Sequence, residues 1–366
     1  MELQVNFIAF HSGFAARPRR MIARASGIAA LVGLILSTPT LATAQDLTGA
    51  GSTFANPLYQ RWSADFAAKT GIKVNYQSIG SGGGIRQFSE MTVDFGGTDG
   101  PMTDEEIAKA KGGAVLHVPV AMGAVLAVYN LPGVSVPLRM SPDVIADIFL
   151  GKITKWDDRR LGALNKGVKL PSSDILVVHR SDGSGTTYIW TDYLTTVSPE
   201  WAKSIGKGKD VKWPVGLGGK GNEGVAGQVK QLPGAIGYVE LAYARQNKLA
   251  YAIVQNAAGQ FVTPSIESVT AAATAIAKGL PATTDYRVSI INAPGTTAYP
   301  ISSMTWALIY VNQADAAKGK KLLAFLRFGL AEGQKSAAAL DYAPLPKLLV
   351  TQLERRLGQV KLLAAR

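Results

Sequence analysis

The sequence has 366 residues, a formal net charge of +12 at pH 7 and no cysteine. The absence of cysteine excludes disulfide bonds, thiolate metal sites and a cysteine nucleophile. The positive charge favours an anionic small ligand over nucleic acid, although excess lysine that only keeps a surface soluble would give the same charge.

Residues 1–44 have the pattern of an export signal. Four arginines come first: Arg17, Arg19, Arg20 and Arg24. An apolar run over 28–36 follows, and residues 42–44 form the small-x-small pattern that signal peptidase accepts. We therefore expect cleavage after Ala44.

Other interpretations of this segment stay open. A membrane anchor requires an apolar stretch of about 20 residues, and the run over 28–36 is shorter than that. Arg19 and Arg20 could belong to a twin-arginine export signal, although the residues after them match it poorly. Met21 is an alternative start that would shorten the leader without moving the cleavage site.

The chain after the leader keeps 34 basic and 25 acidic residues, a net charge of +9. With about 320 residues it is too long for one compact core, so we expect two domains. It has no later apolar stretch of membrane-spanning length and no cysteine to carry a lipid. These features predict a soluble protein that diffuses freely in the periplasm.

Short apolar strands alternate with amphipathic helices from residue 46 onward, which is typical of an α/β fold with mainly parallel sheets. The first strand is predicted over 47–51. The helix after it repeats Leu58, Trp62 and Phe66 on one face and ends at Gly71. The next strand is predicted over 72–76.

A loop at Ser81-Gly-Gly-Gly precedes a helix with Ile85 and Phe88, and a third strand holds Val93 and Phe95. Further on, Thr103 and Glu106 form a capping box. Another helix is predicted to start at Ser141-Pro142 and to end at Gly151. These start and stop signals are structural and indicate no chemistry.

Two apolar segments, 125–129 and 304–311, are predicted as strands long enough to pass between two lobes. If the chain crosses between lobes at these strands, lobe I consists of residues 45–123 and 298–366. Lobe II then consists of residues 124–297. The glycine-rich segment 216–224 is interpreted as a mobile connection, because Lys220 is followed by glycine where a Walker motif requires serine or threonine.

Three junctions between a strand and a helix are rich in small residues: Thr53-Phe54, Ser81 to Gly84, and Gly183 to Thr186. A short loop, Gly96 to Asp99, also follows a strand. Amides at a helix start are unpaired, and the helix dipole favours negative charge there. Each junction alone is equally typical of an ordinary helix cap, but together they predict a metal-free site for a tetrahedral anion.

The most specific segment reads Arg180-Ser-Asp-Gly-Ser-Gly-Thr-Thr. With Leu-Thr-Gly-Ala-Gly-Ser-Thr-Phe, Gly-Ser-Gly-Gly-Gly and Val-Asp-Phe-Gly-Gly-Thr-Asp, it resembles the PstS-type phosphate-binding proteins. The segments that start at Val211 and Pro233 extend the resemblance over the whole chain after the leader. It implies a type II periplasmic binding protein fold, with two lobes, each built on a mainly parallel sheet, and two crossover strands.

The resemblance also implies the ligand-binding residues. Those expected to bind phosphate, besides the carboxylate considered next, are Thr53, Phe54, Ser81, Arg180, Ser184, Gly185 and Thr186. Asp182 matches the family residue that holds the arginine in place. Gly82 stands where relatives can carry serine, which leaves the number of donors around Ser81 open.

Asp99 places a carboxylate beside an expected anion. Monohydrogen phosphate carries a proton that a carboxylate can accept, whereas sulfate carries none, so a facing carboxylate would leave two acceptors in contact. We therefore predict that Asp99 selects phosphate over sulfate. The alternative is that Asp99 only caps the turn before Pro101.

The implied function is capture of inorganic phosphate by lobe closure and delivery to the transmembrane subunits of an ABC importer with ATPase subunits. We expect no cofactor, no metal, no nucleic-acid partner and a monomer. A binding protein for another oxyanion is one alternative. A secreted phosphatase is another, but His117 is expected in a strand or core, His179 should face away from Arg180, and Ser184 has no evident base.

Overall fold

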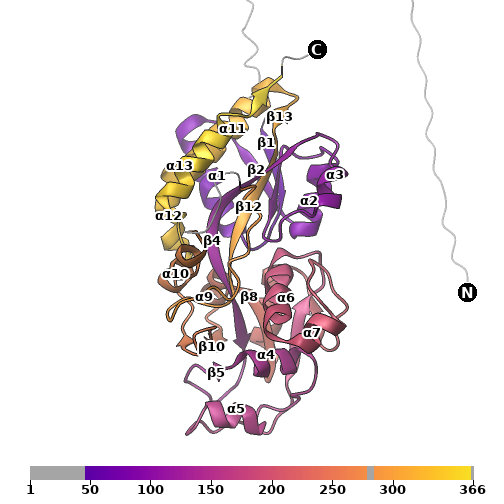
Figure 1. Cartoon of the computed structure of the whole chain (residues 1–366), viewed down its shortest axis with the longest axis vertical. Coiled ribbons are helices and arrows are strands. Elements are labelled where there is room, and N and C mark those ends of the chain that lie inside the picture. The colour runs from indigo at the N-terminus through magenta and orange to yellow at the C-terminus, as the bar shows by residue number, and fades with distance from the viewer. Residues whose placement is uncertain (1–45, 278–283, 364–366) are drawn as a thin grey trace, which may run out of the picture. The chain divides into compact units, whose positions relative to one another are not determined.

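The structure is a computed structural model that describes residues 46–277 and 284–363. The predicted leader and its cleavage site after Ala44 lie outside these residues. Within the described part, strands and helices alternate along the chain as a mixed α/β fold (Figure 1). The predicted fold class is thereby confirmed.

The main sheet of the described residues has nine strands, in the order β2-β1-β3-β12-β4-β8-β6-β7, with β9 also paired to β4. Its strands are β1 Leu47–Gly51, β2 Val74–Ser78, β3 Phe95–Thr98, β4 Val115–Tyr129, β6 Leu176–Arg180, β7 Leu217–Gly219, β8 Ala235–Glu240, β9 Ala250–Tyr251 and β12 Ser302–Tyr310. Two small sheets contain β5 Arg139–Met140, β10 Ile253–Gln255 and β11 Phe261–Val262, and β13 Asn312–Gln313 and β14 Lys361–Leu362.

The helices flank this sheet. They are α1 Asn56–Thr70, α2 Ser81–Ser89, α3 Asp104–Ala108, α4 Pro142–Phe149, α5 Arg159–Leu164, α6 Gly185–Val197, α7 Pro199–Ser204, α8 Gly221–Gln231, α9 Leu241–Gln246, α10 Ile266–Ala277, α11 Ala316–Leu330, α12 Glu332–Ala337 and α13 Lys347–Leu357, with a 3₁₀ turn over Ala338–Leu340. Among the described residues, no helix is both long enough and apolar enough to cross a membrane.

Strand β4 belongs to two halves of the sheet. Its residues 115–124 pair with β12, and its residues 125–129 pair with β8. We call β2, β1, β3 and β12, with the helices packed on them, the first half, and β8, β6 and β7, with theirs, the second half. Parallel pairing joins β2, β1 and β3 in one half and β8, β6 and β7 in the other.

The two predicted hinge segments behave differently. Residues 125–129 form the part of β4 that enters the second half, as expected. Residues 304–310 lie in β12, which pairs with β4 and β3 and so stays in the first half. The chain returns just before β12, where the amide of Val125 donates to the carbonyl of Ile301.

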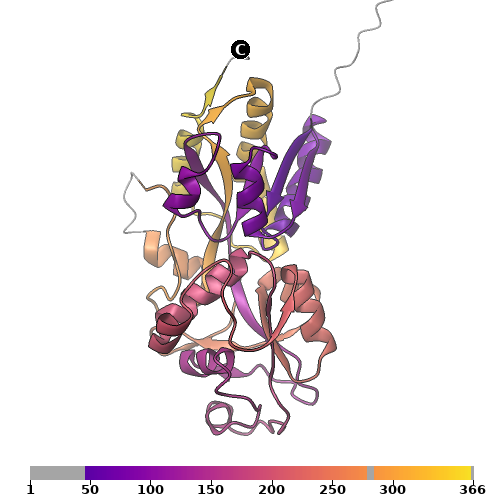
Figure 2. The ribbon, with the colours of Figure 1, turned by 90° about the vertical axis from the view of Figure 1, so that its right-hand side faces the viewer.

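Alternating side chains of the first half fill both faces of its sheet. On one face Phe66 of α1 packs against Phe325 of α11, with ring centroids 5.4 Å apart. On the other face Phe88 of α2 stacks on Tyr310 of β12 at 4.3 Å. Figures 1 and 2 show α11 and α2 on opposite sides of these strands.

Local sequence signals fix several element ends. Gly71 ends α1 in the left-handed conformation, with φ of 73°, as its position predicts. Thr103 and Glu106 form both hydrogen bonds of the capping box at α3. Strand β2 starts at Val74, two residues later than predicted. Strand β3 starts at Phe95, so Val93, which was expected in the third strand, precedes it.

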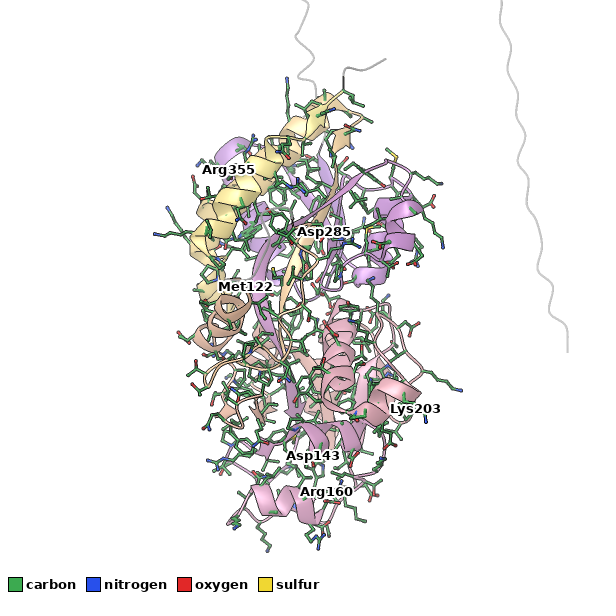
Figure 3. The ribbon with its side chains drawn as sticks, in the orientation of Figure 1. Met122, Asp143, Arg160, Lys203, Asp285 and Arg355 are labelled. Atoms are coloured by element: carbon green, nitrogen blue, oxygen red, sulfur yellow. The ribbon has the colours of Figure 1, made fainter. Side chains whose placement is uncertain are left out.

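The second half carries α4, α5 and α7. Figure 3 labels one exposed or partly exposed residue on each of these helices: Asp143, Arg160 and Lys203. In the same view Arg355 marks α13, which covers the first half. The candidate site lies between these halves, where α2 and α6 begin.

Candidate phosphate site

Asp99 directly follows β3 and is buried, with 1% of its surface exposed. Its Oδ1 accepts hydrogen bonds from the hydroxyl of Ser52 and from the hydroxyl of Thr305, at 2.7 Å in the second case. The backbone amide of Asp99 donates to Ser81 Oγ at 3.1 Å, and that hydroxyl lies 3.4 Å from Asp99 Oδ2. Hydroxyl groups from three separate segments therefore hold this carboxylate.

The surroundings of Asp99 leave it ionised at neutral pH. Burial raises the pKa of Asp99 to about 6, and the hydrogen bonds from Ser52 and Thr305 oppose this rise because they stabilise the charged form. The positive charge of Arg180 acts in the same direction as these hydrogen bonds. At pH 7 the site thus presents a charged acceptor that is shielded from water.

Ser81 begins α2, so the predicted Ser-Gly-Gly-Gly loop is the first turn of the helix rather than a loop. Gly80 precedes it with φ of 83°, a conformation that favours glycine. Gly84 lies against strand β1, and a Cβ atom there would come within 2.4 Å of the Cα of Gly51. These glycines bring the amide end of α2 close to the strands.

Arg180 ends β6, and its side chain is 1% exposed. Its Nε and Nη2 both donate to the carboxylate of Asp182, with Nε at 2.7 Å from Oδ1. Its Nη1 donates to Thr186 Oγ1 at 3.2 Å, and the amide of Gly221 holds Asp182 from another side at 2.9 Å. The guanidinium is therefore fixed in one orientation, as the resemblance implied for Asp182.

The same ion pair sets the protonation of Asp182. Burial alone would raise the pKa of Asp182, but the hydrogen bonds and positive charge of Arg180 outweigh it, so the pKa is lowered. The carboxylate stays charged beside the guanidinium over the physiological range.

Helix α6 begins at Gly185, and Ser184 is its N-cap. Ser184 Oγ accepts a hydrogen bond from the amide of Thr187 at 2.9 Å. Gly185 lies against the first half, because a Cβ atom on it would be 2.4 Å from both Asp99 Oδ2 and Ser81 Oγ. The predicted second-half junction and the two first-half residues are thus brought together.

Asn222, in the first turn of α8, links the halves and was missed by the sequence analysis. Its side-chain amide donates to Thr53 Oγ1 at 2.8 Å and to Thr186 Oγ1 at 3.0 Å. Its Oδ1 accepts from the backbone amide of Glu240 at 2.9 Å, which fixes the orientation of the amide group. Thr53 of the first half thereby meets Thr186 of the second.

Three hydroxyl groups of the site share one feature. The oxygens of Thr53, Ser184 and Thr186 each accept a hydrogen bond from an N–H group of the protein. A hydroxyl has one proton to donate, and accepting a bond through a lone pair leaves that proton available. All three hydroxyls are therefore arranged as donors toward a further acceptor.

Phe54 lies in the turn before α1, where hydrogen bonds and ring packing hold the backbone in place. Its ring is buried and contacts the ring of Tyr342, with centroids 6.1 Å apart, and its carbonyl accepts from the Tyr342 hydroxyl at 2.6 Å. The neighbouring Thr53 carbonyl accepts from Tyr243 at 2.7 Å. These bonds anchor the turn whose Phe54 amide was predicted to face the anion.

The prediction of a mobile connection over 216–224 is wrong. Residues 217–219 form β7, which pairs with β6, and α8 begins at Gly221. Gly221 has φ of 72°, and a Cβ on Gly219 would come within 2.8 Å of the amide nitrogen of Val225. The glycines thus permit a tight strand-to-helix turn, the same type of junction that predicted the other parts of the site.

Ser52 and Thr305 were also missed. Ser52 precedes the predicted Thr53 by one residue, and its neighbouring position in the Gly-Ser-Thr-Phe segment was a usable signal. Thr305 lies in β12, 206 residues from Asp99 along the chain, and no local pattern links the two.

The histidines are arranged as expected. His117 is buried in β4, where its Nε2 accepts from the amide of Met102 at 3.1 Å. His179 stacks on Trp213 at 4.9 Å, while Arg180 faces the site. Within residues 46–277 and 284–363, no cluster of histidine, aspartate and glutamate side chains has the arrangement of a metal site.

Comparisons with known proteins identify relatives of this chain. A family model described as a PBP superfamily domain matches residues 37–331. The phosphate-binding protein PstS of Xylella fastidiosa strain 9a5c is 48% identical over 313 residues, which cover 84% of each chain. The phosphate-binding protein PstS of Pasteurella multocida is 45% identical over 334 residues, 89% of this chain and 94% of its own.

Solved structures share the fold. A phosphate-binding protein from Stenotrophomonas maltophilia has a TM-score of 0.67 at 20% identity, over 85% of this chain and 93% of its own. An ABC-type phosphate transport receptor from Vibrio cholerae has a TM-score of 0.54 at 19% identity, over 82% of this chain and 100% of its own. Together with the sequence relatives, the arrangement establishes that this chain belongs to the PstS family within the PBP superfamily.

Proposed function

We propose that the protein is a periplasmic solute-binding protein that captures inorganic phosphate between its two halves and delivers it to a membrane ABC importer. It acts by binding and release, not by catalysis. The family relationship supports this role, because the PstS relatives are named phosphate-binding proteins.

One observation carries the choice of ligand. The buried carboxylate of Asp99 lies beside a helix start of the opposite half, at Gly185. Monohydrogen phosphate offers one proton to such an acceptor and several oxygens to surrounding donors. Sulfate would face Asp99 with a lone pair, and a buried acceptor without a donor costs about 1–3 kcal/mol or more.

The proposed ligand groups are Ser81 at the start of α2, the hydroxyls of Thr53, Ser184 and Thr186, the amides of Phe54 and Gly185, the Arg180 guanidinium and the Asp99 carboxylate. Asp182 holds Arg180. Micromolar affinity requires about 8 kcal/mol. Charge-assisted hydrogen bonds contribute about 1.5–3 kcal/mol each, so this set is sufficient without a metal.

The proposal includes a domain organisation. Residues 45–123 and 298–366 form lobe I, and residues 124–297 form lobe II. The pairing of β4 supports this division, because it passes from β12 to β8 at Ala124 and Val125.

We also propose export through the leader with cleavage after Ala44, a monomeric state, and direct contact with the transmembrane subunits of the importer. The closed arrangement of the halves would give those subunits a distinct shape to recognise.

Calorimetric titration of the mature protein with phosphate, sulfate, arsenate and molybdate at pH 7.5 tests the function. We expect micromolar or tighter binding of phosphate and at least about 100-fold weaker binding of sulfate, the size of an unpaired buried acceptor. Equal affinities for the two anions would contradict the role given to Asp99. No binding of phosphate would contradict the function itself.

A further inference from the structure

Lys209 connects the two halves outside the group of proposed phosphate ligands. It lies in the second half, in the loop between α7 and β7. Its carbonyl accepts from the backbone amide of Ser184 at 2.7 Å. Its ammonium group crosses to the first half and donates to the carbonyl of Pro101 at 3.0 Å and to Glu106 Oε2 at 2.8 Å. One residue therefore holds the start of α6 and the segment after Asp99 at the same time.

The lysine end of this contact is shielded from solvent, and the glutamate end is partly exposed. The side chain of Lys209 is 12% exposed and that of Glu106 is 34% exposed. The ammonium also lies 5.9 Å from the centroid of the Tyr188 ring, a position that favours a cation. Such a pair is screened less by water and salt than an exposed surface pair.

The segment that Lys209 holds is the one that positions Asp99. Pro101 lies two residues after Asp99, and Gly100 between them packs on Tyr188 of α6, where a Cβ atom would approach the ring to 2.7 Å. Glu106 also caps α3 by accepting from the amide of Thr103 at 2.9 Å. The capping box thus holds the Glu106 carboxylate in a fixed position, and the Lys209 ammonium donates to it there.

We propose that Lys209 is a positioning residue that holds the two halves closed over the anion and thereby slows its release. The inference depends on the proposed function, because it assumes that phosphate is the ligand. The bonds from Lys209 to Pro101 and Glu106 can form only when the halves are closed. An interaction present only in the closed state shifts the equilibrium toward that state and lowers the rate of opening.

Lys207 supplies a matched control. It is two residues away, and its ammonium lies 5.7 Å from the centroid of the same Tyr188 ring. Its salt bridge, however, is to Asp192 Oδ1 at 3.1 Å, on α6 of its own half. Loss of this lysine removes a similar charge and a similar ring contact without removing a bond between the halves.

The test compares Lys209→Met, Lys207→Met and Glu106→Gln by stopped-flow measurement of phosphate association and dissociation. We expect Lys209→Met to raise the dissociation rate about tenfold or more, as for loss of a charged hydrogen bond, with little change in association. Lys207→Met should stay within about twofold of the wild type. Glutamine can still complete the capping box, so Glu106→Gln should raise the dissociation rate without loss of α3. The increase should be smaller than for Lys209→Met, because the bond from Lys209 to the Pro101 carbonyl remains.

The double variant Lys209→Met/Glu106→Gln completes the cycle. Its dissociation rate should be close to that of Lys209→Met, because the pair with Glu106 is already lost in that variant. Unfolding temperatures of the phosphate-free variants should equal that of the wild type. A wild-type dissociation rate in Lys209→Met, an equal effect of Lys207→Met, or additive effects in the double variant would overturn the inference. Failure of the wild type itself to bind phosphate would instead overturn the proposed function, and the inference with it.

Discussion

The backbone of Gly185 lies directly against the carboxyl group of Asp99, so that a Cβ atom on Gly185 would be 2.4 Å from Asp99 Oδ2. The two residues belong to different halves of the sheet and are 86 positions apart in the sequence. Their approach leaves no room for a side chain at position 185, although alanine is a better helix former than glycine.

Gly185→Ala should therefore weaken phosphate binding without weakening the fold. Overpacking costs about 1–3 kcal/mol, which corresponds to roughly a 5- to 150-fold increase in Kd. Calorimetry measures this increase. Thermal unfolding of the phosphate-free protein should shift little, because the open form can accommodate the methyl group. Gly162→Ala on α5 is the control, since a Cβ atom there meets nothing within 4 Å. Wild-type affinity in Gly185→Ala would show that the halves do not close as described.

Asp99→Asn should reduce the discrimination between phosphate and sulfate. An asparagine keeps the shape of the side chain, so the hydroxyls of Ser52 and Thr305 can still bond to it, but its amide can donate to a sulfate oxygen. We expect the ratio of the two affinities to fall by at least about tenfold, the size of one recovered hydrogen bond. Titrations of wild type and variant with both anions measure the ratio. An unchanged ratio would assign selectivity to another residue.

Arg180→Ala should weaken phosphate binding by about 2–4 kcal/mol, because a charged donor to the anion is lost and Asp182 is left without its partner. Asp182 would keep its bond from the Gly221 amide. Arg160→Ala is the control: Arg160 pairs with Asp147 and Asp158 on the second half and is 40% exposed (Figure 3). If both arginine variants bound phosphate equally well, Arg180 would be structural.

His117→Gln should change the pH dependence of stability. Burial, and then the charge of Arg287, lower the pKa of His117 from 6.5 to about 4. Between these values the unfolded chain binds a proton that the folded protein does not, so stability falls as the pH falls from 6.5 to 4. Each pKa unit corresponds to about 1.4 kcal/mol, so His117 accounts for about 3 kcal/mol of this loss.

Glutamine retains an acceptor for the Met102 amide but does not titrate. The difference in free energy of unfolding between His117→Gln and the wild type should therefore move in favour of the variant as the pH is lowered through this range. Urea unfolding at pH 4.5, 5.5 and 7 measures it. A constant difference would mean that His117 titrates normally in the folded protein.

The sequence predicted those parts of the site that are marked by local chain geometry. Ser81 and Ser184 stand at helix starts, and Thr53 stands in the turn before α1, where small polar residues and glycine are recognisable. Asn222 stands at a similar start, but the density of glycine around it indicated mobility rather than a turn. Thr305 could not be predicted, because its only relation to Asp99 is the pairing of β12 with β3, which depends on the whole fold.

Of the two predicted hinge segments, only the one in β4 passes between the halves. The apolar run of β4 is visible in the sequence, but the exact residue at which its partner changes from β12 to β8 depends on strands that lie far away along the chain.

The shared strand β4 also limits how the halves can move. Its consecutive residues bond to β12 and then to β8, so the halves can rotate about one segment but cannot slide along each other without breaking a ladder. A closing motion that keeps both ladders therefore preserves the register of β4 with β12 and with β8. Repeated cycles of loading and unloading would then retain a fixed alignment, which neither helix start could impose by itself.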